Sequence, residues 1–288
     1  MPPASDTREH RGRSSTCVYC FARKTHSYLD LDTGQGFDSQ IVVKVNAPAL
    51  LRRELAARRW RGEHIAMGTN VDCYQRAEGR YGLMPGILEA LRDHANPFSI
   101  LTKGTLILRD LPLLRQAAAV TDIGISVSVG FLDRELWRTV EPGTPAPERR
   151  LEVVRTLTAH GIPCGVLMAP VIPFLGDAPE QLRATVRAVA EAGAGSVTPL
   201  VLHLRPGARE WFMAWLGQHH PHLVRRYETM YADGAYAPTW YQRRITRQVH
   251  DLATEYGIGP GRARRIPEPP TPEPAADAPP EPTQLTLL

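Results

Sequence analysis

The sequence predicts an α/β protein built on an open, partial barrel of parallel strands. Short runs rich in β-branched residues alternate with longer amphipathic segments, and this alternation indicates a parallel sheet with right-handed crossover helices. Six such units occur, which is too few for an eight-stranded barrel. No glycine-rich phosphate loop of the GxGxxG or GxxxxGK(S/T) kind is present. A six-unit partial barrel is therefore the expected fold class.

The units follow one another in a regular order. The six expected strands are 40–45, 64–70, 98–104, 122–130, 162–172 and 196–204. Helices are expected between them at 47–59, 84–94, 111–120, 147–161 and 179–195. After the last strand, two segments rich in aromatic residues, 208–231 and 239–257, predict C-terminal helices that pack on the barrel.

The changes in composition along the chain predict four regions. Residues 1–12 are polar and are expected to be a mobile N-terminus, and residues 13–205 hold the barrel. Residues 206–265 form the helical extension. From 266 to 288 the chain is rich in Pro, Glu and Ala, a composition that cannot bury a core, so a disordered Pro-rich tail is expected.

The overall composition excludes several classes of protein. Of the 288 residues, 43% are hydrophobic and 22% are charged, which is ordinary for a soluble globular protein. No apolar run approaches the roughly 18 residues that would span a bilayer, and the N-terminus has no apolar signal region. Four scattered cysteines are too few for a disulfide framework. We therefore expect a cytoplasmic protein with no membrane association.

The charge is moderately basic, with a net charge of +4, and arginine greatly outnumbers lysine. Basic clusters occur at 51–61, 241–247 and 261–265. Two interpretations are open at this stage. The clusters are either solvated helix faces or a surface that attracts phosphate, since guanidinium groups pair with phosphate through two hydrogen bonds.

Small and polar residues recur where the expected strands end. They are Gly68, Thr69 and Asn70; Thr102 and Lys103; Ser126 and Ser128; and the residues from Pro170 onward. The carboxyl ends of parallel strands form the site in such folds, so these residues predict a shared pocket. The histidines of HHPH are interrupted by Pro221, which spoils the helical spacing of metal ligands. We expect His219, His220 and His222 to form a solvated helix end.

A set of motifs in fixed order resembles the radical S-adenosylmethionine (SAM) superfamily, and in particular the branch related to spore photoproduct lyase. The motifs are CVYCFAR, VVKVNAP, GTNVDCYQ, ILTKG, SVSV and APVIPFLGD. The resemblance implies a partial (β/α)6 radical SAM barrel with a 4Fe-4S cluster held by a Cys-x-x-x-Cys-x-x-Cys motif. It also implies reductive cleavage of SAM to a 5′-deoxyadenosyl radical, with the electron supplied by a donor protein or molecule.

The resemblance also implies roles for particular residues. Cys17 and Cys20 fit the second and third cluster ligands. The residues that occupy SAM-binding positions are Gly68, Thr69 and Asn70 for the amino group, Ser126 and Ser128 for the ribose, and Val171 and Ile172 for the adenine. No catalytic residue is assigned, because the hydrogen relay of spore photoproduct lyases has no identifiable counterpart here. The repair activity of spore photoproduct lyases is therefore not expected of this chain.

The first cluster ligand departs from the family pattern. Its position is occupied by Arg13, which is permanently protonated and cannot ligate iron. Three explanations remain open: a decayed or misread copy, replacement of the ligand by Cys73, or loss of radical chemistry with retention of the fold. If Cys73 is not a cluster ligand, it is an inert thiol in a loop. Cys164 lies inside an apolar run and is expected to be a small buried hydrophobic residue.

The last five residues resemble the peptide with which bacterial repair proteins bind the DNA sliding clamp. Gln284, Leu285, Leu287 and Leu288 match that pattern at the end of the Pro-rich tail. The leading hypothesis is a radical SAM enzyme that acts on DNA or a DNA-associated substrate. The alternative is a cluster-deficient relative that binds DNA or the clamp without catalysis. A third reading is a radical SAM enzyme that modifies a protein or a small molecule.

Overall fold

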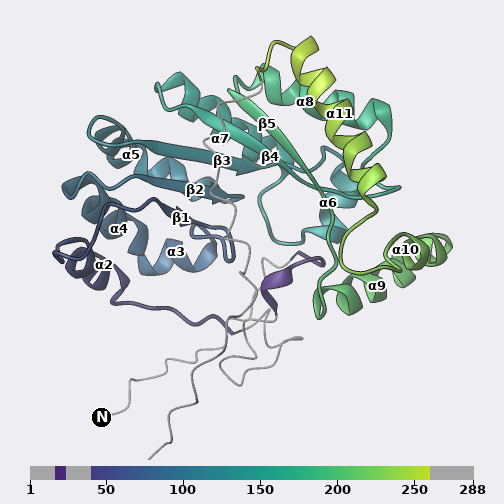
Figure 1. Cartoon of the computed structure of the whole chain (residues 1–288), viewed down its shortest axis with the longest axis horizontal. Coiled ribbons are helices and arrows are strands. Elements are labelled where there is room, and N and C mark those ends of the chain that lie inside the picture. Colours follow the sequence, from purple (N-terminus) through teal and green to yellow (C-terminus); the bar gives the residue numbers. More distant parts are fainter. Residues whose placement is uncertain (1–16, 24–39, 260–288) are drawn as a thin grey trace, which may run out of the picture.

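The computed structural model describes residues 17–23 and 40–259. Within these ranges the chain forms one parallel sheet in the order β1-β2-β3-β4-β5 (Figure 1). The strands are β1 (Ile65–Met67), β2 (Phe98–Thr102), β3 (Ile123–Ser128), β4 (Cys164–Val171) and β5 (Ser196–Val201). Sequence order equals spatial order and every pairing is parallel, so each connection is a crossover. The predicted α/β partial-barrel class is confirmed.

Helices occupy the crossovers and the C-terminal region. They are α2 (Ala47–Leu55), α3 (Arg76–Tyr81), α4 (Leu83–Asp93), η2 (Thr105–Asp110), α5 (Leu111–Ala118), α6 (Arg134–Val140), α7 (Pro147–Ala159), α8 (Pro179–Glu191), α9 (Ala208–His219), η3 (Pro221–Leu223), α10 (Val224–Met230) and α11 (Thr239–Glu255), where η2 and η3 are 3₁₀ helices. Four of the longer helices, α2, α5, α7 and α8, carry proline in the first turn, where its missing N–H costs nothing. The carboxylate of Asp133 caps α6 by accepting hydrogen bonds from two backbone N–H groups.

The two faces of the sheet differ in burial because side chains alternate along each strand. On one face, Phe98, Ile100, Ile125, Val127 and Val166 are at most 2% exposed and form the core. The opposite face, called the small-residue face, carries Ser99, Gly124, Ser126 and Gly165, with Leu101 and Leu167 beside them. There Gly165 lies so close to Ser196 that a Cβ atom would come within 2.5 Å of the Ser196 hydroxyl oxygen. One face thus packs against the helices, and the other has small residues at several adjacent positions.

One predicted strand is wrong. Residues 40–45 form no strand, and Ile41, Val42 and Val45 are 44%, 55% and 65% exposed. A β-branched run becomes a strand only where a neighbouring strand offers hydrogen-bond partners, and none of the described strands lies beside it. The described residues therefore contain five of the six expected strands.

The C-terminal helices pack on the sheet as expected. Figure 1 shows α11 lying along α8 at the β5 edge, with α9 and α10 below it. Ile245 and Val249 of α11 are fully buried, and Tyr231 donates a hydrogen bond to the carbonyl of Leu202 at the end of β5. None of the described helices is both long and apolar enough to cross a membrane. The predicted N-terminal region 1–12 and the tail 266–288 lie outside the described residues.

Candidate active site

The two cysteines of the CVYC motif lie on one tight turn. The N–H of Cys20 donates to the carbonyl of Cys17 at 3.0 Å, and a single 3₁₀ turn follows. Cys17 is buried and Cys20 is half-buried. The N–H of Val18 donates to the carbonyl of Val140 at 2.9 Å, which ties the turn to the end of α6. The spacing of the motif thus brings both thiols to the same place on the protein.

This cysteine turn (residues 17–23) reaches across the carboxyl ends of the strands. On one side, the ammonium of Lys103, just after β2, lies 5.7 Å from the centre of the Tyr19 ring. On the other side, the ring of Phe21 lies 5.7 Å from the ring of His203, which follows β5. Figure 1 shows the turn in purple between the strand ends and α9. The sequence predicts a site at this edge, and the structure brings the thiols there.

A buried group of charges holds the turn from below. The Tyr19 hydroxyl donates to the carboxylate of Glu141, and the same carboxylate forms an ion pair with Arg150. Glu141 and Arg150 are each 1% exposed. The ammonium of Lys103 lies 3.8 Å from the Glu141 carboxylate and completes the group. Tyr19, Lys103, Glu141 and Arg150 are called the buried charge group below.

Every guanidinium nitrogen of Arg150 has a hydrogen-bond partner, and these contacts offset the cost of burying its charge. Its guanidinium donates to the carbonyls of Pro145 and Ser128, at 2.7 and 3.1 Å, and to the hydroxyl of Thr144 at 2.7 Å. A buried charge is tolerated only when it is paired and hydrogen-bonded, and both conditions hold here. Arg150 therefore links α7 to the end of β3 and to Glu141.

Burial and the neighbouring charges shift the pKa values of the site residues in opposite directions. Burial raises the pKa of the Cys17 thiol to about 12, although the ammonium of Lys103 acts to lower it. Burial alone would raise the pKa of Glu141, but Arg150 and Lys103 outweigh it and hold that pKa below its usual range. Burial raises the pKa of the Tyr19 phenol, so its hydroxyl stays a donor. The cations beside Cys17 are suited to offset the negative charge of a ligating thiolate.

The loop after β1 is fixed to the end of β2 by Asp72. Its carboxylate accepts from the hydroxyl of Thr102 at 2.6 Å and from the N–H groups of Lys103 and Tyr74, at 2.7 and 2.9 Å. This loop carries the predicted SAM-binding residues and Cys73. Asp72 is thus a positioning residue that sequence analysis did not single out.

The predicted contacts to the SAM amino group lie at the start of this loop. Gly68 has φ = +81°, and a Cβ atom there would come within 1.9 Å of the carbonyl oxygen of Leu101. The backbone therefore requires glycine at this position whether or not a ligand binds. Thr69 and Asn70 are exposed next to it and stay available for a ligand.

The predicted ribose and adenine contacts are more deeply placed. Ser126 is half-buried on the small-residue face of the sheet, whereas Ser128 is 4% exposed and donates to the carbonyl of Ala169 at 2.9 Å. Val171 and Ile172 are fully buried in the core. Their proposed contacts with SAM stay predictions, and in this structure only Ser126 of the four is open to solvent in part.

The remaining cysteines and the histidines lie apart from any metal-binding arrangement. Among the described residues, no group of three or more His, Cys, Asp or Glu side chains is placed to hold a metal ion, so Cys73 does not join Cys17 and Cys20 in one. Burial and the nearby Asp72 raise the pKa of Cys73 far above its usual value. Cys164 is 1% exposed in the core. His219 and His222 are exposed where α9 ends, and His220 between them is half-buried.

The donor set fits an iron-sulfur cluster only in part. Cys17 and Cys20 share one turn beside Lys103, as two ligands of a single cluster would. The described residues supply no third thiolate to this turn, and position 13, which is arginine, lies outside them. A cluster bound through three protein thiolates would therefore need a ligand from outside the described residues.

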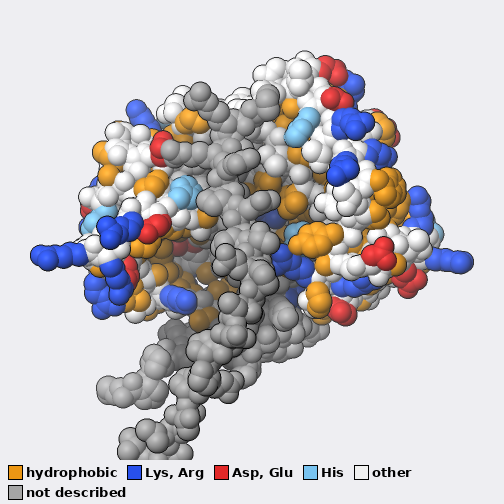
Figure 2. All heavy atoms as spheres, viewed as in Figure 1, with side chains coloured by type: hydrophobic (Ala, Val, Ile, Leu, Met, Phe, Trp, Pro, Cys, Tyr) orange, Lys and Arg blue, Asp and Glu red, His pale blue; other side chains and the backbone are white. Residues whose placement is uncertain are grey.

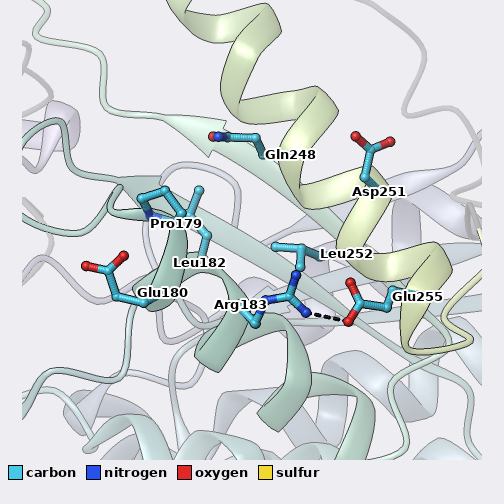
Figure 3. A pocket seen from close by; sticks show the side chains of 8 residues that line it. All are labelled: Pro179, Glu180, Leu182, Arg183, Gln248, Asp251, Leu252 and Glu255. Atoms are coloured by element: carbon cyan, nitrogen blue, oxygen red, sulfur yellow. Dashed lines mark hydrogen bonds and ion pairs between the residues drawn. The ribbon is translucent and has the colours of Figure 1, made fainter.

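Two hollows on the surface involve none of these residues. One, of about 490 Å³, opens between α8 and α11, where the ion pair of Arg183 and Glu255 closes one end and the amide of Gln248 points across it (Figure 3). The other, of about 600 Å³, runs along the exposed face of α11. Neither contains a residue of the cysteine turn, so the candidate site is the strand-end edge itself.

Comparisons with known proteins agree with this geometry. The family model of the radical SAM superfamily matches residues 12–189. An uncharacterized protein of Mycobacterium tuberculosis H37Rv is 48% identical over 279 residues, which cover 97% of this chain and 80% of that protein.

Two solved structures share the fold at low sequence identity. Spore photoproduct lyase with bound AdoMet and dinucleoside spore photoproduct has a TM-score of 0.63 at 15% identity, covering 84% of this chain and 71% of that one. SuiB of Streptococcus suis bound to its precursor peptide SuiA has a TM-score of 0.50 at 15% identity, covering 84% and 44%. With the family model matching more than half of its residues, this chain belongs to the radical SAM superfamily.

Proposed function

We propose that this protein is a radical SAM enzyme that acts on DNA or a DNA-associated substrate. The observation that carries the proposal is the cysteine turn, which holds two thiols at the carboxyl ends of the strands above the buried charge group. When bound, a reduced iron-sulfur cluster supplies the electron for reductive cleavage of SAM. The protein itself would ligate the cluster, orient SAM and the substrate, and exclude water from the site.

The residues of this chain divide these tasks. Cys17 and Cys20 would ligate two irons, and the hydrogen bond from Tyr19 to Glu141 would fix the turn between them. Lys103 would offset the negative charge of the thiolates. Thr69 and Asn70 are exposed at the same edge and would bind the amino group of SAM.

Three observations support nucleic acid as the substrate class. Arg243 and Arg247 are exposed on α11 and form no ion pair with any described residue. The segment 284–288 resembles a clamp-binding peptide, although it lies outside the described residues. A structural neighbour, spore photoproduct lyase, was solved with a bound dinucleoside spore photoproduct.

Anaerobic reconstitution with iron and sulfide tests the cluster. If Arg13 leaves two ligands, the unaltered protein should hold a labile cluster with well under four irons per chain. Arg13→Cys should then hold a stable cluster that cleaves SAM, measured by iron content, electron paramagnetic resonance and 5′-deoxyadenosine formation. A stable, SAM-cleaving cluster in the unaltered protein would contradict this expectation. Cys73→Ser then decides whether Cys73 is the third ligand.

The second candidate function is a cluster-deficient relative that binds DNA or the clamp without catalysis. It is favoured by Arg13 and by the two-thiol donor set of the described residues. A protein that binds DNA but takes up no cluster, even as Arg13→Cys, would support it. A radical SAM enzyme that modifies a peptide is the remaining alternative, and SuiB offers a structural parallel for it.

A further inference from the structure

A row of three tilted rings begins next to the second cysteine and ends at the surface. Phe21 follows Cys20 directly, and its ring lies 5.7 Å from the ring of His203. The ring of His203 in turn lies 5.7 Å from that of Tyr236, which is 55% exposed. Phe21, His203 and Tyr236 are called the aromatic row. Its outer ring, Tyr236, offers a flat aromatic surface to solvent.

The backbone holds this row rigidly. His203 and Tyr236 face each other in an isolated antiparallel bridge, and the N–H of Leu204 donates to the carbonyl of Ala235 at 2.7 Å. The guanidinium of Arg209 donates to the carbonyl of Tyr231 at 2.8 Å and fixes the start of the same loop. An exposed aromatic side chain on an ordered loop loses little conformational entropy when it binds a partner.

A guanidinium group accompanies the rings. Arg205 lies 5.5 Å from the centre of the Phe21 ring, and its Nη2 lies 3.4 Å from the Tyr236 hydroxyl. Arg205 is exposed, and no ion pair joins it to a described residue. Burial, reinforced by Arg205, lowers the pKa of His203, so that ring is neutral at neutral pH. Figure 2 shows one face of the protein, on which hydrophobic, histidine and basic side chains lie close together.

We propose that the aromatic row is a stacking site for an unpaired nucleobase of a nucleic acid strand, with Arg205 bound to the adjoining phosphate. Every base has a flat π face, and stacking on an aromatic side chain is the usual way proteins hold an unpaired base. A guanidinium binds phosphate through paired hydrogen bonds. The row leads from the stacked base inward to Phe21, which directly follows Cys20 in the cysteine turn. The proposal rests on the nucleic acid substrate class proposed above.

Fluorescence of a single-stranded decamer with one central 2-aminopurine tests the proposal on the full-length protein without added cluster. The unaltered protein should bind this strand and quench the probe, because stacking quenches 2-aminopurine. Tyr236→Leu should weaken binding about tenfold and remove the quenching. Tyr236→Phe keeps the ring and should behave as the unaltered protein does. Because Tyr236 is more than half exposed, both variants should keep the unaltered melting temperature.

Two further arms separate the possible sources of the base and the role of Arg205. The salt dependence of strand binding is the slope of log Kd against log salt concentration. Arg205→Gln should lower this slope by about 0.7, which is the contribution of one phosphate of a single strand. Free 2-aminopurine riboside should be quenched far less than the strand at equal concentration. Equal quenching of the free nucleoside would overturn the strand as the source and assign the row to a free nucleoside.

The remaining outcomes distinguish this inference from the proposed function. If Tyr236→Leu binds and quenches as the unaltered protein does, while Arg243→Gln/Arg247→Gln weakens binding, the stacking site is wrong and the nucleic acid partner stands. If the unaltered protein binds neither single-stranded nor duplex DNA at low salt, the substrate class is wrong and the stacking site is overturned with it.

Discussion

The phenol of Tyr19 donates a hydrogen bond to the carboxylate of Glu141, a residue 122 positions further along the chain. Tyr19 stands between the two cysteines, and Glu141 is paired with Arg150 in the core. The position of the thiols is therefore tied to an ion pair that belongs to α6 and α7. This relationship makes the cysteine turn part of the folded core even before any metal binds.

Tyr19→Phe should lower the stability of the cluster-free protein. The substitution keeps the ring and removes one hydrogen bond to a buried carboxylate, an interaction worth about 1.5–3 kcal/mol. Urea unfolding followed by circular dichroism should show a fall in the free energy of unfolding in that range. Tyr256→Phe is the matched control, because its hydroxyl contacts only the exposed Arg183, and a change below about 0.5 kcal/mol is expected. Equal effects in the two variants would contradict the role assigned to Tyr19.

Glu141→Gln should destabilise the protein in a pH-dependent way. Removing the carboxylate leaves Arg150 buried without its anion, which typically costs about 3–5 kcal/mol. The pKa of Glu141 is lowered in the folded protein, so its contribution is complete above the usual value near 4.5 and is lost as the pH falls through the lower folded pKa. Unfolding free energies at pH 7 and pH 3.5 should show a large difference between the two proteins at pH 7 and a smaller one at pH 3.5.

The control for this pH dependence is Glu152→Gln. Glu152 forms an exposed ion pair with Arg155, and such pairs contribute about 0.2–1 kcal/mol. If Glu141→Gln lowers the free energy of unfolding as little as this control does, the buried charge group does not stabilise the core.

Gly68→Ala should be more damaging than its backbone angle alone predicts. Alanine at φ = +81° costs about 1–2 kcal/mol in strain, and its Cβ atom would also collide with the Leu101 carbonyl of β2. Gly62→Ala is a matched control, with φ = +74° and no atom within 4 Å of the added Cβ. Thermal unfolding should therefore show a clearly lower melting temperature for Gly68→Ala than for Gly62→Ala. Equal melting temperatures would mean that the loop after β1 moves away from β2 at no cost.

The sequence predicts the strands well where they lie in the core. Each of the five observed strands falls inside a predicted run, because alternation of β-branched residues with helical segments is a local signal. The segment 40–45 has the same composition and forms no strand, since a strand also needs a neighbour. Local pattern cannot supply that information.

Small and polar residues such as Lys103 predict a site at the strand ends, and the structure brings the cysteine turn to the same edge. The residues that support the turn were not predicted. Glu141 was missed because Val-Glu-Pro-Gly-Thr resembles an exposed turn, and only contacts with Tyr19 and Arg150 from distant parts of the chain bury it. Asp72 was missed for the same reason, since Thr102 at the end of β2 and Lys103 after it lie about 30 residues away along the chain.

The tail, residues 266–288, lies outside the described residues, but its predicted partner can be tested without the barrel. A peptide of the last dozen residues should bind the sliding clamp with modest affinity, because an extended segment loses about 1–2 kcal/mol of backbone freedom per residue that becomes fixed. Changing Leu287 and Leu288 to Ala should abolish binding in a fluorescence polarisation assay, since each buried leucine contributes roughly 1.5–3 kcal/mol. Thr286→Ala should change little. A peptide that shows no binding at high concentration would remove the clamp from the list of partners.

The exposed arginines of α11 give the most direct test of duplex binding. Arg243 and Arg247 line the hollow along this helix and form no ion pair with a described residue, so their guanidinium groups are available to phosphate. Each duplex phosphate that a protein neutralises contributes about 0.9 to the slope of log affinity against log salt. Arg243→Gln/Arg247→Gln should therefore lower that slope by up to about 1.8. The matched control is Arg183→Gln/Arg187→Gln, which removes the same charge from arginines already paired with Glu255 and Glu191. If both double variants lower the slope equally, the effect is one of net charge, and α11 is not the contact surface.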